Sequence, residues 1–362
     1  MERKKICLIG QFPPPLHGLS EALQTLVVGL KNDFDFEIID IKDNKKILFN
    51  LNKIKRSQAD LFYFTLSQSK GGNFRDLLIL SLIARKNKKC AVHLHGGYYR
   101  DMLENSLGRR QREKNYKAMK KVDGAIVLSP SLKHIFSGMV PSEKIFVVPN
   151  CAEKKYVLTE EEMRQKLAGQ TSKNVFDVLY LSNFIPEKGY KEVLALAKNE
   201  KERFEANAAR RFRFHFAGSF FDRKEEKYFN DFIEKENLQS FVTYYGVADG
   251  EKKRELLKKC DFFILLTRYP KEGLPISILE AMGGGMAIVA TDHAAIGDMI
   301  SEGENGVVCK TGEEKNIVAL YDRMYALHEK LPEIAMRNRE KVIANYSEAQ
   351  YLARLRKIFL EI

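Results

Sequence analysis

Residues 270–292 read PKEGLPISILEAMGGGMAIVATD, a loop followed by a helix pattern and then by a buried strand pattern. Two carboxylates in it, Glu272 and Glu280, have seven residues between them, and the second falls within the helix pattern. We expect the Gly-Leu-Pro at 273–275 to begin the helix, because a proline is well tolerated in a first helical turn. Such a helix start favours a phosphate, and Glu272 could then accept hydrogen bonds from sugar hydroxyls and Glu280 from a ribose.

The N-terminal half alternates strand and helix patterns. The strand patterns occupy 4–10, 34–41, 60–66, 90–94, 124–128 and 144–148, and the helical patterns 19–30, 74–86, 109–121 and 130–137. The strands are apolar runs, which is typical of a parallel sheet covered on both faces. The scheme repeats from residue 175, and three helical patterns follow residue 311. The sequence therefore predicts two doubly wound α/β domains with a cleft between them, 1–165 and 172–346, with the linker in the polar stretch 151–173.

The composition is that of a globular protein: 362 residues, of which 44% are hydrophobic and 30% are charged. No segment has the pattern of a signal peptide, and the longest apolar run, 77–84, is far shorter than the roughly 20 residues of a membrane span. The five cysteines lack metal-ligand spacing, so we expect buried free thiols. These features predict a cytosolic protein.

The net charge of +12 lies entirely in the first 150 residues, which hold 26 Lys and Arg against 14 Asp and Glu. The surplus concentrates between Lys53 and Lys121 and includes the basic helix pattern RRQREKNYKAMKK at 109–121. A solvated charged face is the ordinary interpretation of such a run. The alternative that we favour is peripheral docking on anionic lipid, which attracts each basic residue by roughly 1 kcal/mol. We expect no nucleic-acid partner, because no binding motif is present.

From residue 177 to residue 310 the chain resembles the donor-binding half of the retaining GT-B glycosyltransferases of family 4. The matching motifs are VLYLSNFIPEKGY, FRFHFAG, VTYYGVADGEKKRELLKKCDFFILLT, the 270–292 segment with its E-x7-E spacing, and EGENGVVCK. A pair of glutamates alone would be weak evidence for this family, whereas five motifs in the right order and spacing are strong evidence. The resemblance implies two Rossmann-like domains facing a central cleft, with the last helical segment, 347–362, packing back on the N-terminal domain.

The resemblance also implies a donor site. Glu272 would contact hydroxyls of the donor sugar, Glu280 the ribose, and Lys188 the diphosphate. The family usually has an arginine five positions before this lysine, where this chain has Asn183, which brings no charge. The other expected donor contacts directly precede the helix pattern: Gly273, Leu274 and Pro275.

In the N-terminal half the resemblance implies contacts from two loops. Gly18, with Leu19, belongs to the loop after the first strand, whose backbone would approach the donor phosphate and the acceptor. His95, at the end of the strand pattern 90–94, would lie near the C6 hydroxyl of the donor sugar. His17 fits a local turn as well as an acceptor contact.

Two places in the sequence carry residue types that can bind a metal. Period two puts His93 and His95 on one face of their strand, which raises zinc as an alternative. No third ligand is spaced nearby, so we expect no metal. The D-x-D at 33–35 falls between a helix pattern and a strand pattern, and we interpret it as a turn.

The resemblance implies a retaining, metal-independent transferase without a cofactor. It would move a sugar from a nucleotide sugar, preferably a UDP-sugar, to a glycan or a polyprenyl-diphosphate-linked saccharide in bacterial cell-surface polysaccharide biosynthesis. No obvious nucleophile is present, and the resemblance implies a front-face mechanism. We expect the protein in the cytoplasm, docked on the inner face of the cytoplasmic membrane. One alternative is transfer to a small soluble acceptor. The other is a non-catalytic GT-B binding or assembly subunit, which Asn183 favours because the family usually has an arginine at this position.

Overall fold

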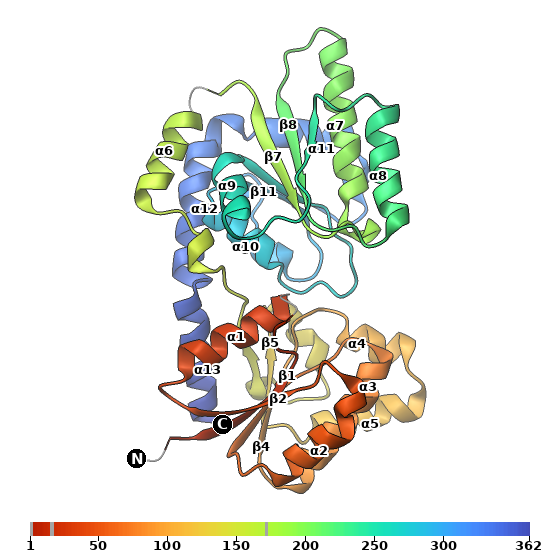
Figure 1. Cartoon of the computed structure of the whole chain (residues 1–362), viewed down its shortest axis with the longest axis vertical. Helices are drawn as coiled ribbons and strands as arrows, with labels where there is room; N and C mark the ends of the chain where they lie inside the picture. The colour runs from red at the N-terminus through yellow and green to blue at the C-terminus, as the bar shows by residue number, and fades with distance from the viewer. Residues whose placement is uncertain (1–2, 15–17, 171–172) are drawn as a thin grey trace. The chain divides into compact units, whose positions relative to one another are not determined.

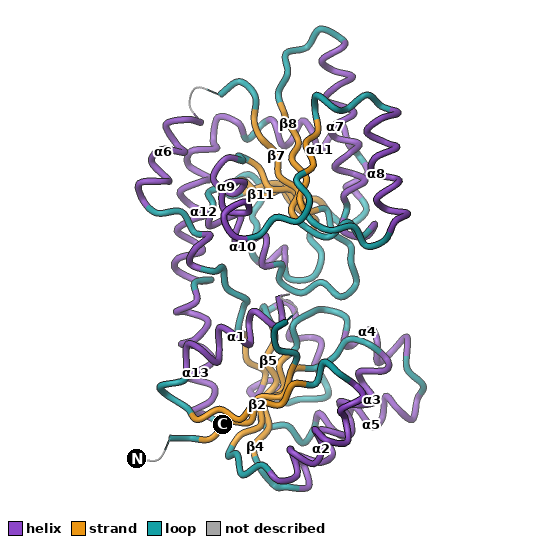
Figure 2. Tube along the Cα trace, in the orientation of Figure 1, coloured by secondary structure: helices purple, strands orange, loops and turns teal. Residues whose placement is uncertain are grey.

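The computed structural model describes residues 3–14, 18–170 and 173–362. Contacts divide the chain into two compact units. The first unit contains the described residues up to Cys151 together with Pro270–Leu274 and Glu348–Ile362, and the second contains Ala152–Tyr269 and Pro275–Ser347. In each unit the strands lie at the centre and the helices outside (Figure 2). Position 17, considered above as a turn or an acceptor contact, lies outside the described residues.

The first unit is built on a six-stranded parallel sheet with the order β2-β1-β3-β4-β5-β6 (Figure 1). All five residues of β3 are buried, as the apolar run predicted for a sheet covered on both faces. The strands are β1 (Lys5–Gly10), β2 (Asp35–Asp40), β3 (Leu61–Thr65), β4 (Lys89–His93), β5 (Gly124–Val127) and β6 (Ile145–Val147).

Helices α1 and α13 cover one face of this sheet, and α2, α3 and α5 cover the other (Figure 1). The segment expected as a helix at 130–137 is a 3-10 helix, Ser131–Phe136. The helices are α1 (Gly18–Leu30), α2 (Ile47–Arg56), α3 (Lys70–Arg85), α4 (Tyr99–Asp101), α5 (Arg109–Met119) and α13 (Glu348–Glu361).

The C-terminal helix belongs to the first unit, as predicted. Tyr351, Leu355 and Phe359 of α13 are buried in the same apolar core as β1 and α1. The Tyr351 hydroxyl donates a hydrogen bond to the Ala22 carbonyl at 3.2 Å, and the Lys4 ammonium donates to the Phe359 carbonyl at 2.8 Å. Burial of large apolar side chains, rather than these bonds, supplies most of the stabilisation of this helix.

The second unit repeats the plan, with a parallel sheet of order β12-β11-β10-β7-β8-β9. Helices α7, α8 and α11 cover one face, and α6, α9, α10 and α12 the other (Figure 1). The strands are β7 (Phe176–Leu181), β8 (Phe212–Ala217), β9 (Val242–Tyr244), β10 (Phe262–Leu265), β11 (Ala287–Thr291) and β12 (Gly306–Cys309). The helices are α6 (Glu160–Gln170), α7 (Tyr190–Glu205), α8 (Arg223–Lys235), α9 (Gly250–Lys259), α10 (Ile276–Gly283), α11 (Ile317–Tyr325) and α12 (Leu331–Asn345).

The boundary between the units differs from the expected one. Residue 165 falls inside α6, a helix that the sequence interpretation treated as part of a polar linker. Buried Lys166 anchors α6 to the second unit, since its ammonium donates to the carbonyls of Leu257, Cys260 and Gly284 at 3.1, 2.6 and 2.6 Å. The N-terminal stretch of the first unit therefore ends at Cys151, and α6 belongs to the second unit rather than to a linker.

Four of the five cysteines are buried free thiols, as expected, and Cys151 is half-buried. Burial raises the pKa of the Cys7 and Cys90 thiols to about 12, so both are protonated at neutral pH and unreactive. In the described part of the chain no helix is long and apolar enough to cross a membrane.

Candidate functional site

The loop after β7 carries two expected donor contacts of the second unit. Asn183 is exposed, and its side-chain oxygen accepts a hydrogen bond from the Ser219 hydroxyl at 2.9 Å. Lys188 ends a 3-10 turn, Pro186–Lys188, and its ammonium lies 5.2 Å from the centre of the Tyr269 ring. These residues follow β7, β8 and β10, so they gather at the carboxyl edge of the sheet, where doubly wound folds bind ligands.

Gly189 shapes the turn that presents Lys188. Its φ of 82° lies in the left-handed region, which a side chain disfavours. A Cβ added to this glycine would lie 2.3 Å from the backbone oxygen of Leu266, at the end of β10. Only glycine therefore lets the β7–α7 turn approach β10 so closely.

Glu280 is a buried carboxylate on α10, only 1% exposed. The Lys253 ammonium of α9 pairs with it at 2.6 Å and also lies 4.2 Å from the centre of the Tyr156 ring. A buried carboxylate requires a partner of this kind, because an isolated charge is costly to remove from water. The expectation of a buried and partnered carboxylate is confirmed, whereas its contact with a ribose stays a prediction.

Helix α10 begins later than expected. Pro275 is the residue before the helix, with a ψ of 120°, and Ile276 is the first helical residue. The expectation that Gly273 and Leu274 begin the helix is therefore wrong. A proline disfavours the helical conformation in the residue before it, which keeps Leu274 in the loop.

The loop with Glu272 packs inside the first unit. A Cβ on Gly273 would lie 2.8 Å from Leu128 Cδ1 and 2.9 Å from the Cα of Gly96. The Asn150 amide, after β6, donates a hydrogen bond to the Leu274 carbonyl at 2.8 Å. These contacts leave Glu272 only 8% exposed, next to the segment that follows β4.

His95 lies in that segment and packs its ring on His93, with ring centres 3.9 Å apart. Burial lowers the pKa of His95 to about 4, against a smaller opposing effect of the nearby Asn150 amide. Burial and the neighbouring ring also hold the pKa of His93 well below its usual range, while its Nδ1 lies 2.5 Å from the Tyr63 hydroxyl. Both rings are therefore neutral at pH 7. Within the described residues both ring nitrogens of His95 are buried, and neither has a hydrogen-bond partner.

A polar cavity of about 280 Å³ lies beside His95 in the first unit, at the carboxyl ends of β1, β3 and β4. Lys271 brings positive charge to its wall, whereas the largely buried guanidinium of Arg75 is paired with Asp76 at 3.0 Å. Leu19 also lines it, whereas Gly18 is exposed at the first position of α1. The remaining polar residues of the wall are Gln11, Thr65, Ser67, Gln68 and Ser69.

The structure thus groups the predicted residues by unit. Lys188 and Asn183 share the carboxyl edge of the second sheet, while Glu272, Gly273 and His95 share the region after β4 in the first unit. Among the residues that the structure describes, no group of three or more His, Cys, Asp and Glu side chains could hold a metal ion.

Three residues with a place in these groups escaped the sequence interpretation: Asn150, Lys253 and Tyr269. Asn150 holds a carbonyl 124 positions later in the chain. Lys253 is one of four lysines in its helix, GEKKRELLKK, so its sequence surroundings carried no signal. Of the three, only Lys253 could have been sought from the sequence, as a positively charged partner for one of the motif glutamates.

Comparisons with known proteins agree with this architecture. The structure of HepE from Anabaena in complex with UDP aligns over 99% of this chain and 100% of its own, with a TM-score of 0.75 and 15% sequence identity. At this identity the likeness shows the fold alone, and the GT-B fold expected from the sequence is confirmed.

Two sequence relatives match over part of their length. The Salmonella typhimurium protein WcaL, named for colanic acid biosynthesis, is 24% identical over 34% of this chain and 32% of its own length. A Xanthomonas oryzae protein named GDP-mannose:cellobiosyl-diphosphopolyprenol alpha-mannosyltransferase is 24% identical over 66% of this chain and 58% of its own. The chain thus covers less than two thirds of the length of each.

A family model described as glycosyl transferases group 1 matches residues 159–341, half of the chain. The matched range contains Asn183, Lys188, Glu272 and Glu280. The chain therefore belongs to the glycosyl transferases group 1 family.

Proposed function

We propose that this protein is a retaining glycosyltransferase of family 4 that moves a sugar from a nucleotide sugar to a saccharide acceptor. The observation that carries the proposal is that the family-matched region contains both Lys188, at the carboxyl edge of the second sheet, and Glu280, a buried carboxylate on α10 whose ionic partner is Lys253. A lysine at this edge suits a diphosphate, and a carboxylate suits ribose hydroxyls.

In the proposed reaction the ammonium of Lys188 stabilises the charge that develops on the leaving diphosphate. Glu272 and neutral His95 contact the donor sugar, with Gly18, Gly273, Leu274 and Pro275 in the surrounding loops. The acceptor hydroxyl attacks from the face that the diphosphate leaves, and a phosphate oxygen takes its proton. Electrostatic stabilisation of this kind is usually the largest catalytic contribution, and the proposed reaction requires no metal.

For the donor we propose a UDP-sugar. HepE, which shares this fold, was solved with UDP, whereas the name of the Xanthomonas relative specifies GDP-mannose. The guanine nucleotide is therefore the first alternative to measure.

For the acceptor we propose a glycan or a polyprenyl-diphosphate-linked saccharide of a bacterial surface polysaccharide. The names of the two relatives, one for colanic acid biosynthesis and one for a diphosphopolyprenol acceptor, support this class. The polar cavity beside His95 offers hydroxyl-binding groups, and Lys271 in its wall adds a positive charge. For the polyprenyl-linked acceptor, which is anchored in a bilayer, we propose that the reaction takes place in the cytoplasm at the inner face of the membrane.

A thermal-shift panel with UDP, GDP, ADP and CMP, each with and without EDTA, tests the donor assignment. A nucleotide at a hundred times its dissociation constant stabilises the folded state by about 2.7 kcal/mol. We expect UDP to raise the melting temperature with or without EDTA, Lys188→Ala to weaken the shift, and exposed Lys235→Ala to preserve it. A rise that disappears with EDTA would contradict metal independence.

The second candidate is a non-catalytic member that binds a nucleotide sugar without turning it over. The observation in its favour is Asn183, which brings an amide bonded to Ser219 where the family usually has a positive charge. Release of nucleotide from the donor would exclude this candidate, and binding without any release would support it. Turnover with a soluble saccharide alone would favour the small soluble acceptor.

A further inference from the structure

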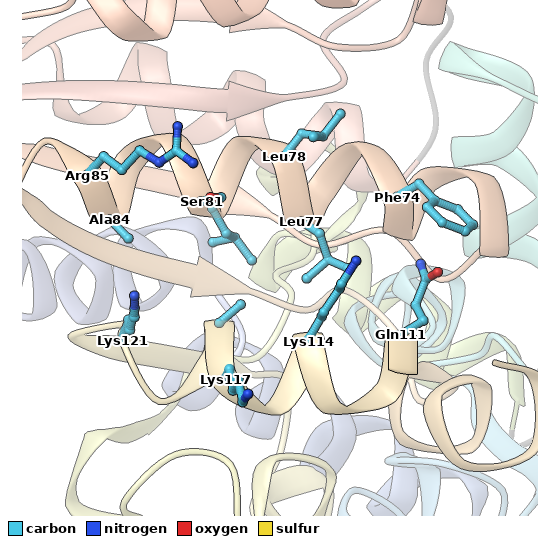
Figure 3. Close-up of a pocket in the computed structure, with 12 residues that line it drawn as sticks. Phe74, Leu77, Leu78, Ser81, Ala84, Arg85, Gln111, Lys114, Lys117 and Lys121 are labelled. Atoms are coloured by element: carbon cyan, nitrogen blue, oxygen red, sulfur yellow. The ribbon is translucent and has the colours of Figure 1, made fainter. Parts of the chain in front are cut away.

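A groove of about 620 Å³ runs between α3 and α5 on the first unit (Figure 3). The wall that α3 supplies is mainly apolar, with Phe74, Leu77, Leu78 and Ala84. The opposite wall is basic, with Lys114 and Lys117 on α5 and Lys121 directly after it. Apolar and cationic side chains therefore face a common hollow.

Two large apolar side chains on the α3 wall lie open to solvent. Phe74 is 59% exposed and Leu78 is 56% exposed, and they stand four positions apart, on one face of the helix. Neighbouring α2 adds exposed Leu48 and Phe49. Exposed apolar side chains that are grouped and rimmed by charge mark interaction sites more often than scattered ones do.

The positive charge around the groove indicates that its partner is negatively charged. Helix α5 carries five basic residues and one acidic residue, and Arg85 of α3 adds a further cation at the groove. A second hollow of about 460 Å³ on α5 is lined by Arg112, Lys117 and Lys120, with Glu113 and Tyr116. The first 150 residues hold the whole positive surplus of the chain, so this face is complementary to an extended anionic partner.

We propose that α3 and α5 form a docking surface for an anionic phospholipid bilayer. Phe74 and Leu78 enter the boundary between head groups and acyl chains, and the three lysines pair with lipid phosphates. This combination of an apolar and a cationic contact is the one that binds peripheral proteins to anionic membranes. The inference rests on the proposed function, because a lipid-linked acceptor lies in a membrane. Binding to vesicles is nevertheless measured independently of donor binding.

The test is flotation of the full chain with phosphatidylcholine vesicles, with and without phosphatidylglycerol. One variant removes the apolar contact, Phe74→Ser with Leu78→Ser, and another reverses the charge, Lys114→Glu with Lys117→Glu and Lys121→Glu. The matched controls change exposed residues of the second unit by the same chemistry: Phe221→Ser with Val318→Ser, and Lys224→Glu with Lys235→Glu and Lys330→Glu.

We expect binding to vesicles that contain phosphatidylglycerol and little binding to phosphatidylcholine alone. The charge reversal should lower the partition coefficient by at least roughly 100-fold, because each of the three lost basic residues contributes roughly fivefold and the three glutamates add repulsion. The apolar pair should lower it at least tenfold, and both controls should bind as the unchanged protein does. Unchanged UDP-induced thermal shifts in all four variants would show that they are folded and that the donor site is intact.

Three results would overturn the proposal. The first is absence of binding to anionic vesicles, and the second is an equal loss of binding in the charge reversal and its control, which would reduce the effect to net charge. The third is that the unchanged protein sediments as a dimer and the Phe74→Ser, Leu78→Ser variant as a monomer, because the groove would then hold a second copy of the chain. Loss of the UDP shift in the unchanged protein would contradict the proposed function without bearing on flotation.

Discussion

Among single residues, Glu272 and Lys188 are the two on which the proposed sugar transfer depends most. We expect Glu272→Ala and Lys188→Ala each to reduce sugar transfer by at least about 100-fold, since removal of one group that stabilises a transition state typically costs that much. Exposed Glu255→Ala and Lys235→Ala serve as controls and should transfer normally. Steady-state rates, with melting temperatures to confirm folding, check this expectation. Near-full activity of either site variant would remove that residue from the mechanism.

Asp177 supports a prediction about stability and pH. Its carboxylate, 8% exposed, lies 2.7 Å from His215 Nε2 and 3.1 Å from the Lys173 ammonium. Burial acts to raise its pKa, but the hydrogen bond from His215 and the Lys173 charge outweigh burial and lower the pKa of Asp177 to about 2. The ionised form therefore stabilises the folded state. This contribution is complete above the unfolded pKa near 4 and is lost as pH falls towards 2.

Asp177→Asn should lower the free energy of unfolding by about 2 kcal/mol at pH 7, because asparagine keeps an acceptor for His215 but loses the charge. The difference from the unchanged protein should shrink when urea unfolding is repeated at pH 3 and below. Exposed Asp322→Asn should have little effect at either pH. A destabilisation that is equal at pH 7 and pH 2.5 would mean that charge is not its cause.

The sequence identifies site residues that lie in a local motif, but not residues that reach the site through contacts between distant segments. Glu272, Glu280 and Lys188 were found because a local motif surrounds each of them. Their neighbours Asn150, Lys253 and Tyr269 were not found, because each meets its site through folding of distant segments. The histidine pair was noticed from its spacing, but its burial and neutral state depend on packing that spacing does not record.

At the scale of elements, the β7–α7 turn gives the sharpest prediction. Gly189→Ala should destabilise the protein by at least about 1–2 kcal/mol, because the residue is left-handed and its Cβ would overlap the Leu266 backbone. It should also weaken nucleotide binding, since the turn presents Lys188. Gly169→Ala is the matched control: this glycine lies in α6, with nothing near its Cβ, and alanine there should be neutral or stabilising. Urea unfolding and UDP titration measure both effects.

Most strands were predicted within one or two residues because buried parallel strands are apolar runs with clear ends. Helix α6 was missed because its composition is polar, although Thr159 and Glu162 form a capping box that the sequence displays. Helix α2 was missed because it is short, with two exposed apolar residues that blur its periodicity. Pro275 was placed one position too far into its helix, where local preference alone cannot separate the residue before a helix from the first one inside it.

At the scale of the whole molecule, the two units repeat one plan but divide the chemistry. The family-matched region, 159–341, lies almost entirely in the second unit, apart from the Glu272 loop, which packs in the first. The positive surplus lies in the part of the sequence that builds the first unit. This division is what a transferase needs if one fold binds a nucleotide sugar and the other meets an acceptor at an anionic surface.

Nucleotide release from a panel of UDP- and GDP-sugars, followed by NMR of the first sugar product, tests whether this protein is a retaining transferase. We predict release from at least one donor, unaffected by EDTA, with the anomeric configuration of the donor retained and with the rate at least about 100-fold lower in Lys188→Ala. Release from none of the donors, inversion of configuration, or an undiminished rate in Lys188→Ala would contradict the account.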